Sequence, residues 1–280
     1  MGNYKIHLQA LAIFILANPF MNMKPTNHLE PSIKYEVKDK IAFITINVPK
    51  SLNALNPQSA DELGQAWVKF RDDEKALVAI ISGAGDKAFC VGYEMSPEAL
   101  SISGAMGSVV TVPTSHNIWK PTIAAIHGYC LAGGWWIAQE CDIRIAATDA
   151  QFGIPQVKWG LMPAFSASLP KHLSPGHALE LLLVGDRIDA KRAYEMGFVN
   201  YLVSSEQVIQ KAIALGEKIC ENGPIAVRKA KELFYRARHM DDKNAMDLTW
   251  RLFNENEKTE DCQEGVKAFK EKRKPNFKGR

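Results

Sequence analysis

The chain has 280 residues, and 46% of them are apolar, which is enough to bury the core of a soluble globular protein. Its 34 basic and 31 acidic side chains nearly balance, giving a net charge of +3, so we expect no nucleic-acid partner. The five cysteines are scattered, odd in number and without C-x-x-C spacing. This pattern argues against a disulfide framework or a zinc site and favours a reducing, cytoplasmic location.

The first 30 residues contain one long apolar stretch, IHLQALAIFILANPF, at residues 6–20. This stretch is too short and too interrupted to span a bilayer, so we expect no membrane partner. Lys5 alone would make a weak positively charged region, which leaves a poor signal peptide as the alternative. Met21 and Met23 offer later starting points just before ordinary domain sequence. Residues 1–30 are therefore predicted to be an N-terminal extension, disordered or derived from an upstream start.

Residues 31–204 carry the pattern of an α/β core. Residues 32–49 alternate in polarity around the charged centre KDK, which predicts a β-hairpin, and residues 56–76 open with Asn-Pro and continue at helical spacing. The apolar runs LVAIIS and PTIAAIHG are typical of buried strands, and CDIRIAAT indicates another strand after the helical segment WWIAQE. Strands that alternate with helices predict a core of β-β-α units.

From about residue 205 the strand pattern disappears. Four successive amphipathic segments predict helices: SEQVIQKAIALGEKICENG, PIAVRKAKELFYRARHM, AMDLTWRLFNENEKTE and DCQEGVKAFKEKRK. Because no long linker precedes them, we expect this helical region, residues 205–280, to pack on the core or on a neighbouring subunit.

Two glycine-marked turns follow predicted buried strands, at residues 82–97 (SGAGDKAFCVGYEMSP) and 127–136 (HGYCLAGGWW). The first is no dinucleotide fingerprint, since Ala88 stands where a glycine is needed, and no phosphate-loop G-K-[ST] is present. If the two turns converge, each can direct one backbone N–H at the same oxygen, as an acyl-transfer or enolate intermediate requires. Taken alone, glycines at strand ends are equally consistent with plain turns.

Six spaced blocks resemble, in order, those of the enoyl-CoA hydratase/isomerase (crotonase) superfamily: PKSLNAL, AFCVGYEM, KPTIAAIHGYCLAGG, CDIRIAATDAQFGIPQVKWGLMP, GDRIDAKRAYEMGFVN and EGVKAFKEKRKPNF. The resemblance spans nearly all of residues 33–280. It implies an α/β, crotonase-like spiral of β-β-α units with a C-terminal helical region that makes subunit contacts. It further implies an acyl-CoA thioester as substrate, no metal, no cofactor beyond the substrate's own coenzyme A, and a homotrimer or dimer of trimers.

The same resemblance implies roles for individual residues. The oxyanion hole would consist of the backbone N–H groups of Tyr93 and Gly133, with the thioester oxygen between them. Lys50 would contact a CoA phosphate, and Phe269 and Lys272 match residues that reach the CoA adenine and phosphates, often from a neighbouring subunit. The complete set of substrate-binding residues expected from the family's motifs is Lys50, Ser51, Leu52, Ala54, Cys90, Gly92, Glu94, Met95, Gly134, Phe269 and Lys272.

Two positions depart from the family's hydratase pattern. Hydratases of this family hold the water for syn addition with two glutamates, whereas this sequence has Trp136 and Gln156 at the corresponding places. Neither side chain exchanges a proton at neutral pH, although Gln156 can orient a water and Trp136 supplies one indole donor and a flat wall. General acid–base help contributes roughly 10²–10⁴-fold, so an unaided Trp/Gln pair predicts a poor hydratase.

Another side chain could supply the missing acid or base. Glu140 lies one helical turn after Trp136, Glu94 adjoins the first glycine turn, and His116 precedes the segment WKP. Each also has a plainer role, in a helix interior, a turn or the surface respectively. His127 takes the place of a common turn asparagine and is predicted to be structural.

Two further explanations remain open. The reaction could need little proton transfer from the protein, as in decarboxylation of a malonyl-type CoA or hydrolysis of a bulky, alicyclic or aromatic CoA ester. Trp136 then indicates a flat acyl group or a shortened pocket, while Trp135 packs in the core because adjacent helical side chains diverge by about 100°. Alternatively, the protein is an inactive acyl-CoA-binding subunit. We predict an acyl-CoA lyase or isomerase with an oxyanion hole and a non-standard acid–base site.

Overall fold

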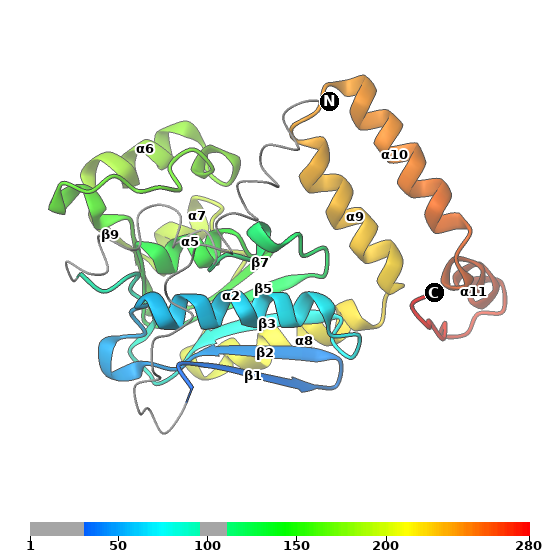
Figure 1. Cartoon of the computed structure of the whole chain (residues 1–280), viewed down its shortest axis with the longest axis horizontal. Helices are drawn as coiled ribbons and strands as arrows, with labels where there is room; N and C mark the ends of the chain where they lie inside the picture. The colour runs from blue at the N-terminus through cyan, green and yellow to red at the C-terminus, as the bar shows by residue number, and fades with distance from the viewer. Residues whose placement is uncertain (1–30, 96–110) are drawn as a thin grey trace, which may run out of the picture. The chain divides into compact units, whose positions relative to one another are not determined.

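The computed structural model describes residues 31–95 and 111–280, so the predicted N-terminal extension lies outside the described residues. A six-stranded sheet in the order β1-β2-β3-β5-β7-β10 forms the centre (Figure 1). Its strands are β1 (Ile33–Lys38), β2 (Ile41–Ile46), β3 (Val78–Gly83), β5 (Thr122–Ile126), β7 (Ile143–Ala147) and β10 (Tyr201–Val203).

The predicted hairpin is confirmed as β1 and β2, which pair antiparallel from Ile33 opposite Ile46 to Lys38 opposite Ile41. Asp39 and Lys40 between them both have positive φ, as the twist of a two-residue hairpin turn requires. All later neighbours in this sheet run parallel. Parallel strands need crossover connections, and those connections carry the remaining strands and helices.

A second sheet contains four three-residue strands in the order β4-β6-β8-β9: β4 (Ala88–Cys90), β6 (Tyr129–Leu131), β8 (Gln151–Gly153) and β9 (Arg187–Asp189). Each of β3, β5 and β7 is followed along the chain by a strand of this second sheet, in turn β4, β6 and β8. A helix follows β6 at once, and a 3₁₀ turn follows β8. This repeat is the predicted β-β-α unit, although the short strands themselves were not predicted individually.

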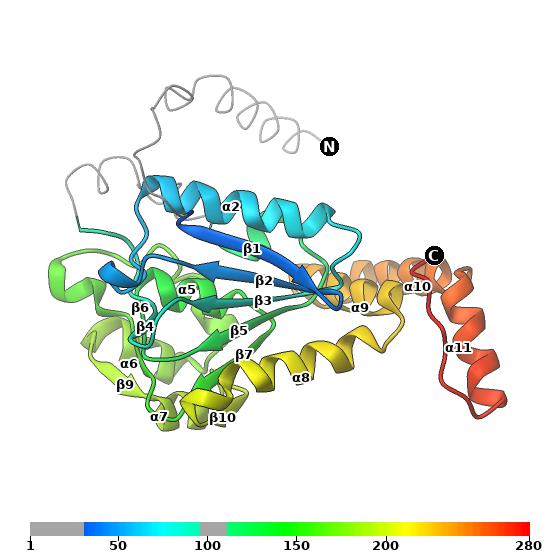
Figure 2. The ribbon, with the colours of Figure 1, turned by 90° about the horizontal axis from the view of Figure 1, so that it is seen from below.

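The helices of the core are α2 (Pro57–Asp72), α5 (Gly133–Gln139), α6 (Pro175–Val184), α7 (Ala190–Glu195) and α8 (Val208–Cys220). The side chains of Asn56 and Ser59 each bond the other's backbone N–H, which fixes the start of α2 in a capping box. α8 contacts β3, β5 and β7, and lies along one face of the six-stranded sheet in Figure 2. The core between the layers is dense in aromatic side chains, with Trp67, Phe70, Phe89, Trp135, Phe152 and Phe198 all fully buried.

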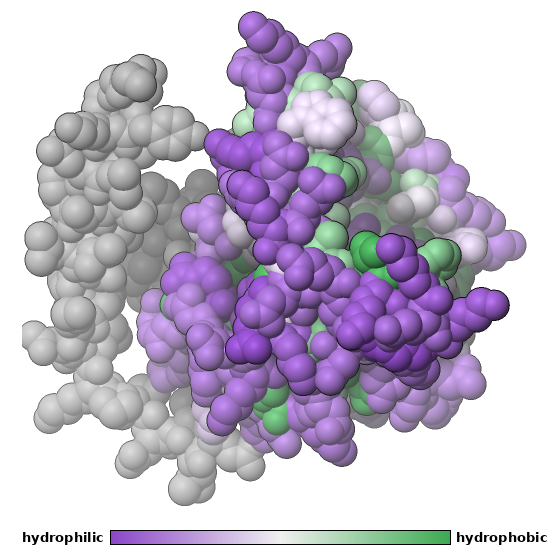
Figure 3. Space-filling model, turned by 90° about the vertical axis from the view of Figure 1, so that its right-hand side faces the viewer, coloured by the Kyte–Doolittle hydropathy of each residue, from purple (hydrophilic) through white to green (hydrophobic). Residues whose placement is uncertain are grey.

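The C-terminal region forms the four predicted helices, since α8 is followed by α9 (Pro224–Ala237), α10 (Asp242–Glu257) and α11 (Glu260–Lys270). α9 is joined to the core at Asp142, whose carboxylate accepts bonds from Lys231 (2.6 Å) and from the Tyr235 hydroxyl (3.0 Å). α10 packs on α9, and α11 contacts α10. Figure 3 shows pale and green patches among the hydrophilic side chains of this side of the molecule. Exposed apolar side chains on these helices are Phe234, Met246, Trp250, Phe253, Val266 and Phe269.

Candidate functional site

The first glycine turn follows β4 and is held against the loop before α2. Leu55 donates its N–H to the Gly92 carbonyl (2.8 Å) and accepts from the Glu94 N–H (2.9 Å), so Leu55 and Tyr93 form an isolated parallel bridge. In a parallel bridge the residue between the two bonded groups directs its own N–H to the opposite side. The Tyr93 amide therefore points away from Leu55.

The second glycine turn connects β6 to α5. Ala132 donates its N–H to the Gly153 carbonyl (3.0 Å) of the neighbouring strand β8, and its backbone adopts φ 51° and ψ −115°. Such a conformation costs a non-glycine residue about 1–3 kcal/mol and persists only where the surroundings impose it. It directs the chain from β6 into α5, where Gly133 is the first residue and its N–H has no partner within the helix.

Bare backbone allows these two turns to meet. Gly92 has φ +99°, and a Cβ there would lie 2.9 Å from the Gly133 nitrogen. A Cβ on Gly134 would lie only 2.0 Å from the Cys90 carbonyl oxygen. β4 and β6 are parallel neighbours, with Cys90 paired to Cys130, so both turns leave the same edge of the second sheet.

The result is a pair of unpaired backbone donors, the N–H groups of Tyr93 and Gly133, which we call the amide pair. Neither amide has a hydrogen-bond acceptor among residues 31–95 and 111–280. The Tyr93 ring lies over Gly133, since a Cβ there would sit 3.0 Å from Tyr93 Cε2. The arrangement can donate two hydrogen bonds from adjacent turns to one oxygen.

Two side chains beside the amide pair, those of Tyr93 and Cys90, are neutral and do not supply a nucleophile. The Tyr93 hydroxyl lies 3.0 Å from Thr111 Oγ1, and burial raises the pKa of this phenol above its usual value. Cys90 is fully buried and accepts the Gly92 N–H at Sγ (3.4 Å). Burial raises the pKa of the Cys90 thiol to about 12, so it remains protonated at neutral pH and is a poor nucleophile.

We refer to Trp136 and Gln156 together as the indole–amide wall. Trp136 lies in α5 three residues after Gly133, is partly buried, and stacks on Phe165 with ring centroids 5.4 Å apart and planes 27° apart. Gln156 lies just after β8 in the 3₁₀ turn Pro155–Trp159, and its Oε1 is buried without a hydrogen-bond partner. Leu131 pairs with Gly153, so the segments that carry Trp136 and Gln156 each follow one of two neighbouring parallel strands, β6 and β8.

Trp135, by contrast, is a core residue, as predicted. Its side chain is fully buried and stacks on Phe198 at 3.9 Å, and its indole N–H donates to Gln139 Oε1 (3.1 Å). Gln139, also fully buried, donates in turn to Ser168 (2.7 Å). Thus the two adjacent tryptophans of LAGGWW serve different parts of the molecule.

The four polar candidates outside these motifs have distinct surroundings. The Glu140 carboxylate, at the end of α5, accepts from Thr114 (2.9 Å) and Gln139 (3.1 Å). Glu94 contributes its backbone to the bridge with Leu55, and His116 accepts from Arg71 at its carbonyl (3.4 Å). His127 Nε2 is buried without a partner, and burial lowers the pKa of this imidazole.

The loop that carries Lys50, Ser51, Leu52 and Ala54 lies beside the first glycine turn. Lys50 is exposed in the short 3₁₀ turn Pro49–Ser51, whereas Asn53 is fully buried. Asn53 donates to the carbonyls of Ala84 (3.0 Å) and Ala88 (2.7 Å) and accepts the Val48 N–H (3.0 Å). Asn53 thus joins two of the predicted CoA-binding segments, and the sequence analysis missed it. Its backbone is left-handed, with φ 58°, and asparagine tolerates this conformation better than most residues, so the residue type was the one signal in the sequence.

Phe269 and Lys272 lie far from the amide pair within one chain. Phe269 is 86% exposed near the end of α11, and Lys272 follows the helix with φ 51°. Figures 1 and 2 both show α11 well away from α5. Met95, at the edge of the described site, is also largely exposed.

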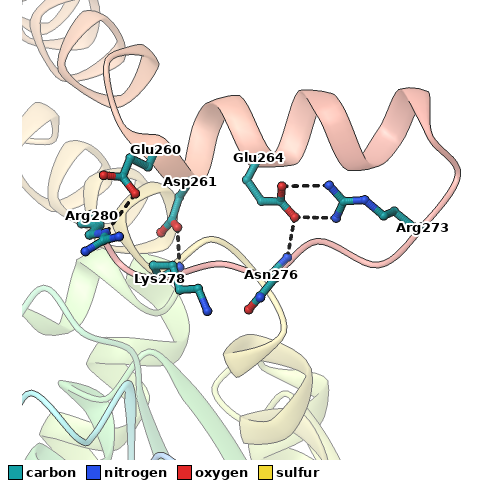
Figure 4. Close-up of a pocket in the computed structure, with 7 residues that line it drawn as sticks. All are labelled: Glu260, Asp261, Glu264, Arg273, Asn276, Lys278 and Arg280. Carbon is teal, nitrogen blue, oxygen red and sulfur yellow. Dashed lines mark hydrogen bonds and ion pairs between the residues drawn. The ribbon is translucent and has the colours of Figure 1, made fainter.

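A surface pocket of about 390 Å³ lies between α11 and the C-terminal tail (Figure 4). Two of its carboxylates are bonded within the pocket: Glu264 binds Arg273 through both oxygens, and Asp261 accepts the backbone N–H groups of Lys278 and Gly279. The Arg273 hydrogen bonds lower the pKa of Glu264 to about 2. These contacts hold the C-terminal tail along α11.

Within the described ranges, no cluster of three or more His, Cys, Asp or Glu side chains is placed to hold a metal ion. The helices of the same ranges include none that is long and apolar enough to cross a membrane.

Comparison with known proteins shows the family to which the chain belongs. The sequence profile described as Enoyl-CoA hydratase/isomerase matches residues 36–280. The chain belongs to the enoyl-CoA hydratase/isomerase family. It is 34% identical to (E)-benzylidenesuccinyl-CoA hydratase of Thauera aromatica over 88% of this chain and 99% of that protein. It is 36% identical to crotonyl-CoA hydratase of Syntrophomonas wolfei over 88% and 97% of the two chains.

Solved structures give the same result for the fold. An enoyl-CoA hydratase from Mycobacterium marinum superimposes with a TM-score of 0.84 at 35% identity, covering 90% of this chain and all (100%) of the other. An enoyl-CoA hydratase from Mycobacterium tuberculosis gives a TM-score of 0.82, also at 35% identity, over 90% and 100% of the chains. The predicted crotonase-like α/β fold is confirmed, and the protein is a member of a family of acyl-CoA enzymes.

Proposed function

We propose that this protein binds a CoA thioester and stabilises its enolate between the N–H groups of Tyr93 and Gly133. The observation that carries the proposal is the amide pair: two turns brought together by bare backbone, with both donors unpaired. A thioester oxygen between them would accept two hydrogen bonds, which strengthen as negative charge develops on that oxygen. Each such donor is worth roughly 2.7–4 kcal/mol of barrier.

The CoA part of the substrate is proposed to bind in two places. One place is the loop that Asn53 joins to the first glycine turn, which contains Lys50, Ser51, Leu52 and Ala54. Phe269 and Lys272 would reach the CoA of a neighbouring subunit. Their exposure and their distance from α5 in one chain are consistent with that role. The exposed apolar side chains of the C-terminal helices support assembly into a homotrimer or dimer of trimers.

The acid–base half of the site is proposed to be non-standard, with Trp136 and Gln156 in place of two glutamates. Both side chains remain neutral, so a water added across a double bond would lack its usual proton acceptor. Hydration, which the names of several relatives specify, would then require Glu140, His116 or Glu94 to take part. Glu140 is the strongest of the three, because it shares the helical face of Trp136.

A second candidate is decarboxylation or hydrolysis of a bulky, alicyclic or aromatic acyl-CoA. The stacked Trp136 and Phe165 favour a flat acyl group, and the name of the Thauera aromatica relative specifies a benzylidene substrate. These reactions depend mainly on the amide pair. A third candidate is an inactive acyl-CoA-binding subunit, which the absence of ionisable groups in the indole–amide wall favours. We further propose a cytoplasmic location, since all five cysteines are free thiols.

The test is incubation of purified protein with crotonyl-CoA, a malonyl-type CoA and an aromatic enoyl-CoA, followed by mass spectrometry of the products. In parallel, a thioester labelled with ¹³C at the carbonyl reports the amide pair, because two hydrogen bonds shift its infrared stretch to lower wavenumber. We expect that shift together with turnover of at least one thioester. Binding and shift without any product would support the inactive subunit.

Two results would contradict the proposal. A bound thioester whose carbonyl stretch matches that in water would remove the role of the amide pair. Hydration of crotonyl-CoA that survives both Gln156→Ala and Glu140→Gln would show that the acid–base site lies elsewhere.

A further inference from the structure

The Tyr93 side chain connects the two residues that carry the amide pair. Its ring lies against the backbone of Gly133, because a Cβ built on Gly133 would sit 3.0 Å from Tyr93 Cε2 and 3.1 Å from Cδ2. The ring therefore fills the space that a side chain at residue 133 would occupy. Since closely packed groups cannot move independently, this contact couples the positions of the two glycine turns.

The hydroxyl end of the ring is held by a buried residue. Tyr93 Oη and Thr111 Oγ1 lie 3.0 Å apart, and Thr111 is only 1% exposed. The Thr111 carbonyl accepts the indole N–H of Trp67 (2.9 Å), a fully buried residue of α2. Two successive hydrogen bonds thus connect the phenol to a helix of the core.

This anchor carries no charge. Burial raises the pKa of the Tyr93 phenol above its usual value, so the hydroxyl stays protonated at neutral pH. The Thr111 hydroxyl is neutral as well. The two groups can therefore restrain the ring without repelling negative charge that develops on an oxygen at the amide pair.

The residue before Tyr93 makes such a restraint important. Gly92 has φ +99°, and glycine is the residue that opposes rotation of the adjoining peptide planes least. The bridge to Leu55 holds the Gly92 carbonyl and the Glu94 N–H, but not the Tyr93 N–H itself. A ring that is packed on Gly133 and bonded at its hydroxyl limits rotation about the Tyr93 backbone, and hence the direction of this N–H.

We propose that the side chain of Tyr93 is a positioning group: its ring, anchored by Thr111, fixes the direction of the Tyr93 N–H relative to that of Gly133. The inference rests on the proposed function, since the restraint affects catalysis only if a thioester oxygen accepts both bonds. Donors that are fixed beforehand need no reorganisation as charge develops on that oxygen. Loosening the phenol should therefore weaken the transition state more than the binding of the ground state.

The experiment measures the infrared carbonyl stretch of bound acetyl-CoA labelled with ¹³C at the thioester carbonyl. Calorimetry gives the affinity, and mass spectrometry confirms that the ligand is intact. Tyr93→Phe keeps the ring and removes its hydroxyl. Thr111→Val removes the other hydroxyl and keeps the backbone carbonyl that Trp67 bonds.

Both variants should reduce the shift of the stretch to lower wavenumber, while the affinity for acetyl-CoA changes by less than about threefold. The double variant should match either single variant, because each substitution alone breaks the same hydrogen bond. For a thioester that the wild type turns over, kcat should fall about 3- to 10-fold with little change in KM. Tyr93→Ala, which also removes the ring, should reduce the infrared shift further.

Tyr35→Phe is the matched control. Tyr35 also donates its hydroxyl through a 3.0 Å hydrogen bond, to Asp73, but it lies on β1. This variant should lose stability in urea and keep the infrared shift of the wild type. The control therefore separates the loss of a tyrosine hydroxyl bond in general from the loss of the bond that anchors the Tyr93 ring.

The outcomes separate the two proposals. A Tyr93→Phe protein that binds acetyl-CoA with the wild-type shift would contradict the inference, as would an equal reduction of the shift in Tyr35→Phe. The proposed function would stand in both cases, because the wild type still shows the shift. A wild type whose bound thioester shows no shift would instead overturn the proposed function. If Tyr93→Ala fails to fold, Tyr93→Phe and Thr111→Val decide the result.

Discussion

The amide pair and the indole–amide wall both include a residue of α5, Gly133 and Trp136 respectively, but they are built in different ways. The amide pair uses backbone only, and its geometry depends on residues that lack a side chain, such as Gly92 and Gly134. The indole–amide wall uses side chains, and its chemistry depends on which residues occupy positions 136 and 156. The first is insensitive to most side-chain replacements nearby, whereas the second is redefined by a single one.

This difference explains how one fold can keep a substrate class and change the reaction. In the proposed function, the backbone donors bind the thioester oxygen that every acyl-CoA substrate carries. Side chains decide which proton moves and which acyl group fits. We therefore expect substitutions in the two halves to have separable effects: glycine substitutions reduce thioester polarisation, and wall substitutions change selectivity.

The largest effect is expected from restoring two carboxylates in the wall. The double variant Trp136→Glu/Gln156→Glu should hydrate crotonyl-CoA about 10²–10⁴-fold faster than the wild type, because it supplies the missing acid and base. The measurement is the loss of enoyl absorbance with time. Trp159→Glu/Gln156→Glu is the control, since it adds the same charge on an exposed position and should give little gain. A wild type already as fast as the double variant would contradict the non-standard acid–base site.

The next largest effect is expected from adding a methyl group where the two glycine turns meet. Gly92→Ala places Cβ 2.9 Å from the Gly133 nitrogen, so the amide pair must separate. We expect turnover of any substrate to fall about 10²–10³-fold and the infrared shift of a bound thioester to shrink. Gly197→Ala is matched in φ (+79° against +99°) and has no heavy atom within 4 Å of its added Cβ. The Gly197→Ala control should lose stability in the same way but keep the infrared shift of the bound thioester. An equal loss of the shift in both variants would contradict the prediction that a Cβ at residue 92 separates the amide pair.

A smaller effect, on stability, is expected from removing the Asn53 side chain, which holds the loop beside the first glycine turn. Asn53→Ala removes three hydrogen bonds, those to the Val48 N–H, to the part-buried Ala84 carbonyl and to the buried Ala88 carbonyl. The free energy of unfolding in urea should fall by about 2–4 kcal/mol. Asn254→Ala, in an exposed position on α10, should change it by less than about 0.5 kcal/mol. An Asn53 variant as stable as that control would show that the two loops do not depend on this side chain.

The smallest effect concerns pH and the polar groups at the far end of α5. Burial, helped by Arg144, Arg238 and Lys171 and opposed by Glu140, lowers the pKa of His172 from 6.5 to about 4. The unfolded chain therefore takes up a proton at higher pH than the folded protein does. The contribution of neutral, buried His172 to the free energy of unfolding is therefore complete above pH 6.5. It decreases as the pH falls from 6.5 towards 4.

Urea titrations at pH 7.5 and pH 5 test this linkage. Between these values the wild type should lose about 1–2 kcal/mol more stability than His172→Gln, which cannot titrate. The difference between the two proteins removes the contribution of carboxylates that protonate in the same range. Equal losses in the two proteins would place His172 in a solvated environment.

Much of the fold was predictable because its signals are local. The hairpin at β1 and β2, the helix α2, the buried strands β3, β5 and β7 and the four C-terminal helices all follow from residue periodicity and turn residues. The strands β4, β6 and β8 were not predicted individually, because three residues are too few for an alternating pattern to stand out. They form through pairing with strands distant in sequence.

Within the site, residue types and the order of the motifs were enough to locate the glycine turns, to identify Trp136 and Gln156 and to recognise the family. Three features could be seen only in the folded chain: the direction of the Tyr93 amide, the connection of two loops by Asn53, and the burial of Gln156 Oε1 without a partner. The physical reason is that residue type and spacing are properties of one segment. The direction of a backbone N–H and the burial of a side-chain oxygen depend on the register between segments 20 to 40 residues apart, such as Leu55 with Tyr93 and Leu131 with Gly153.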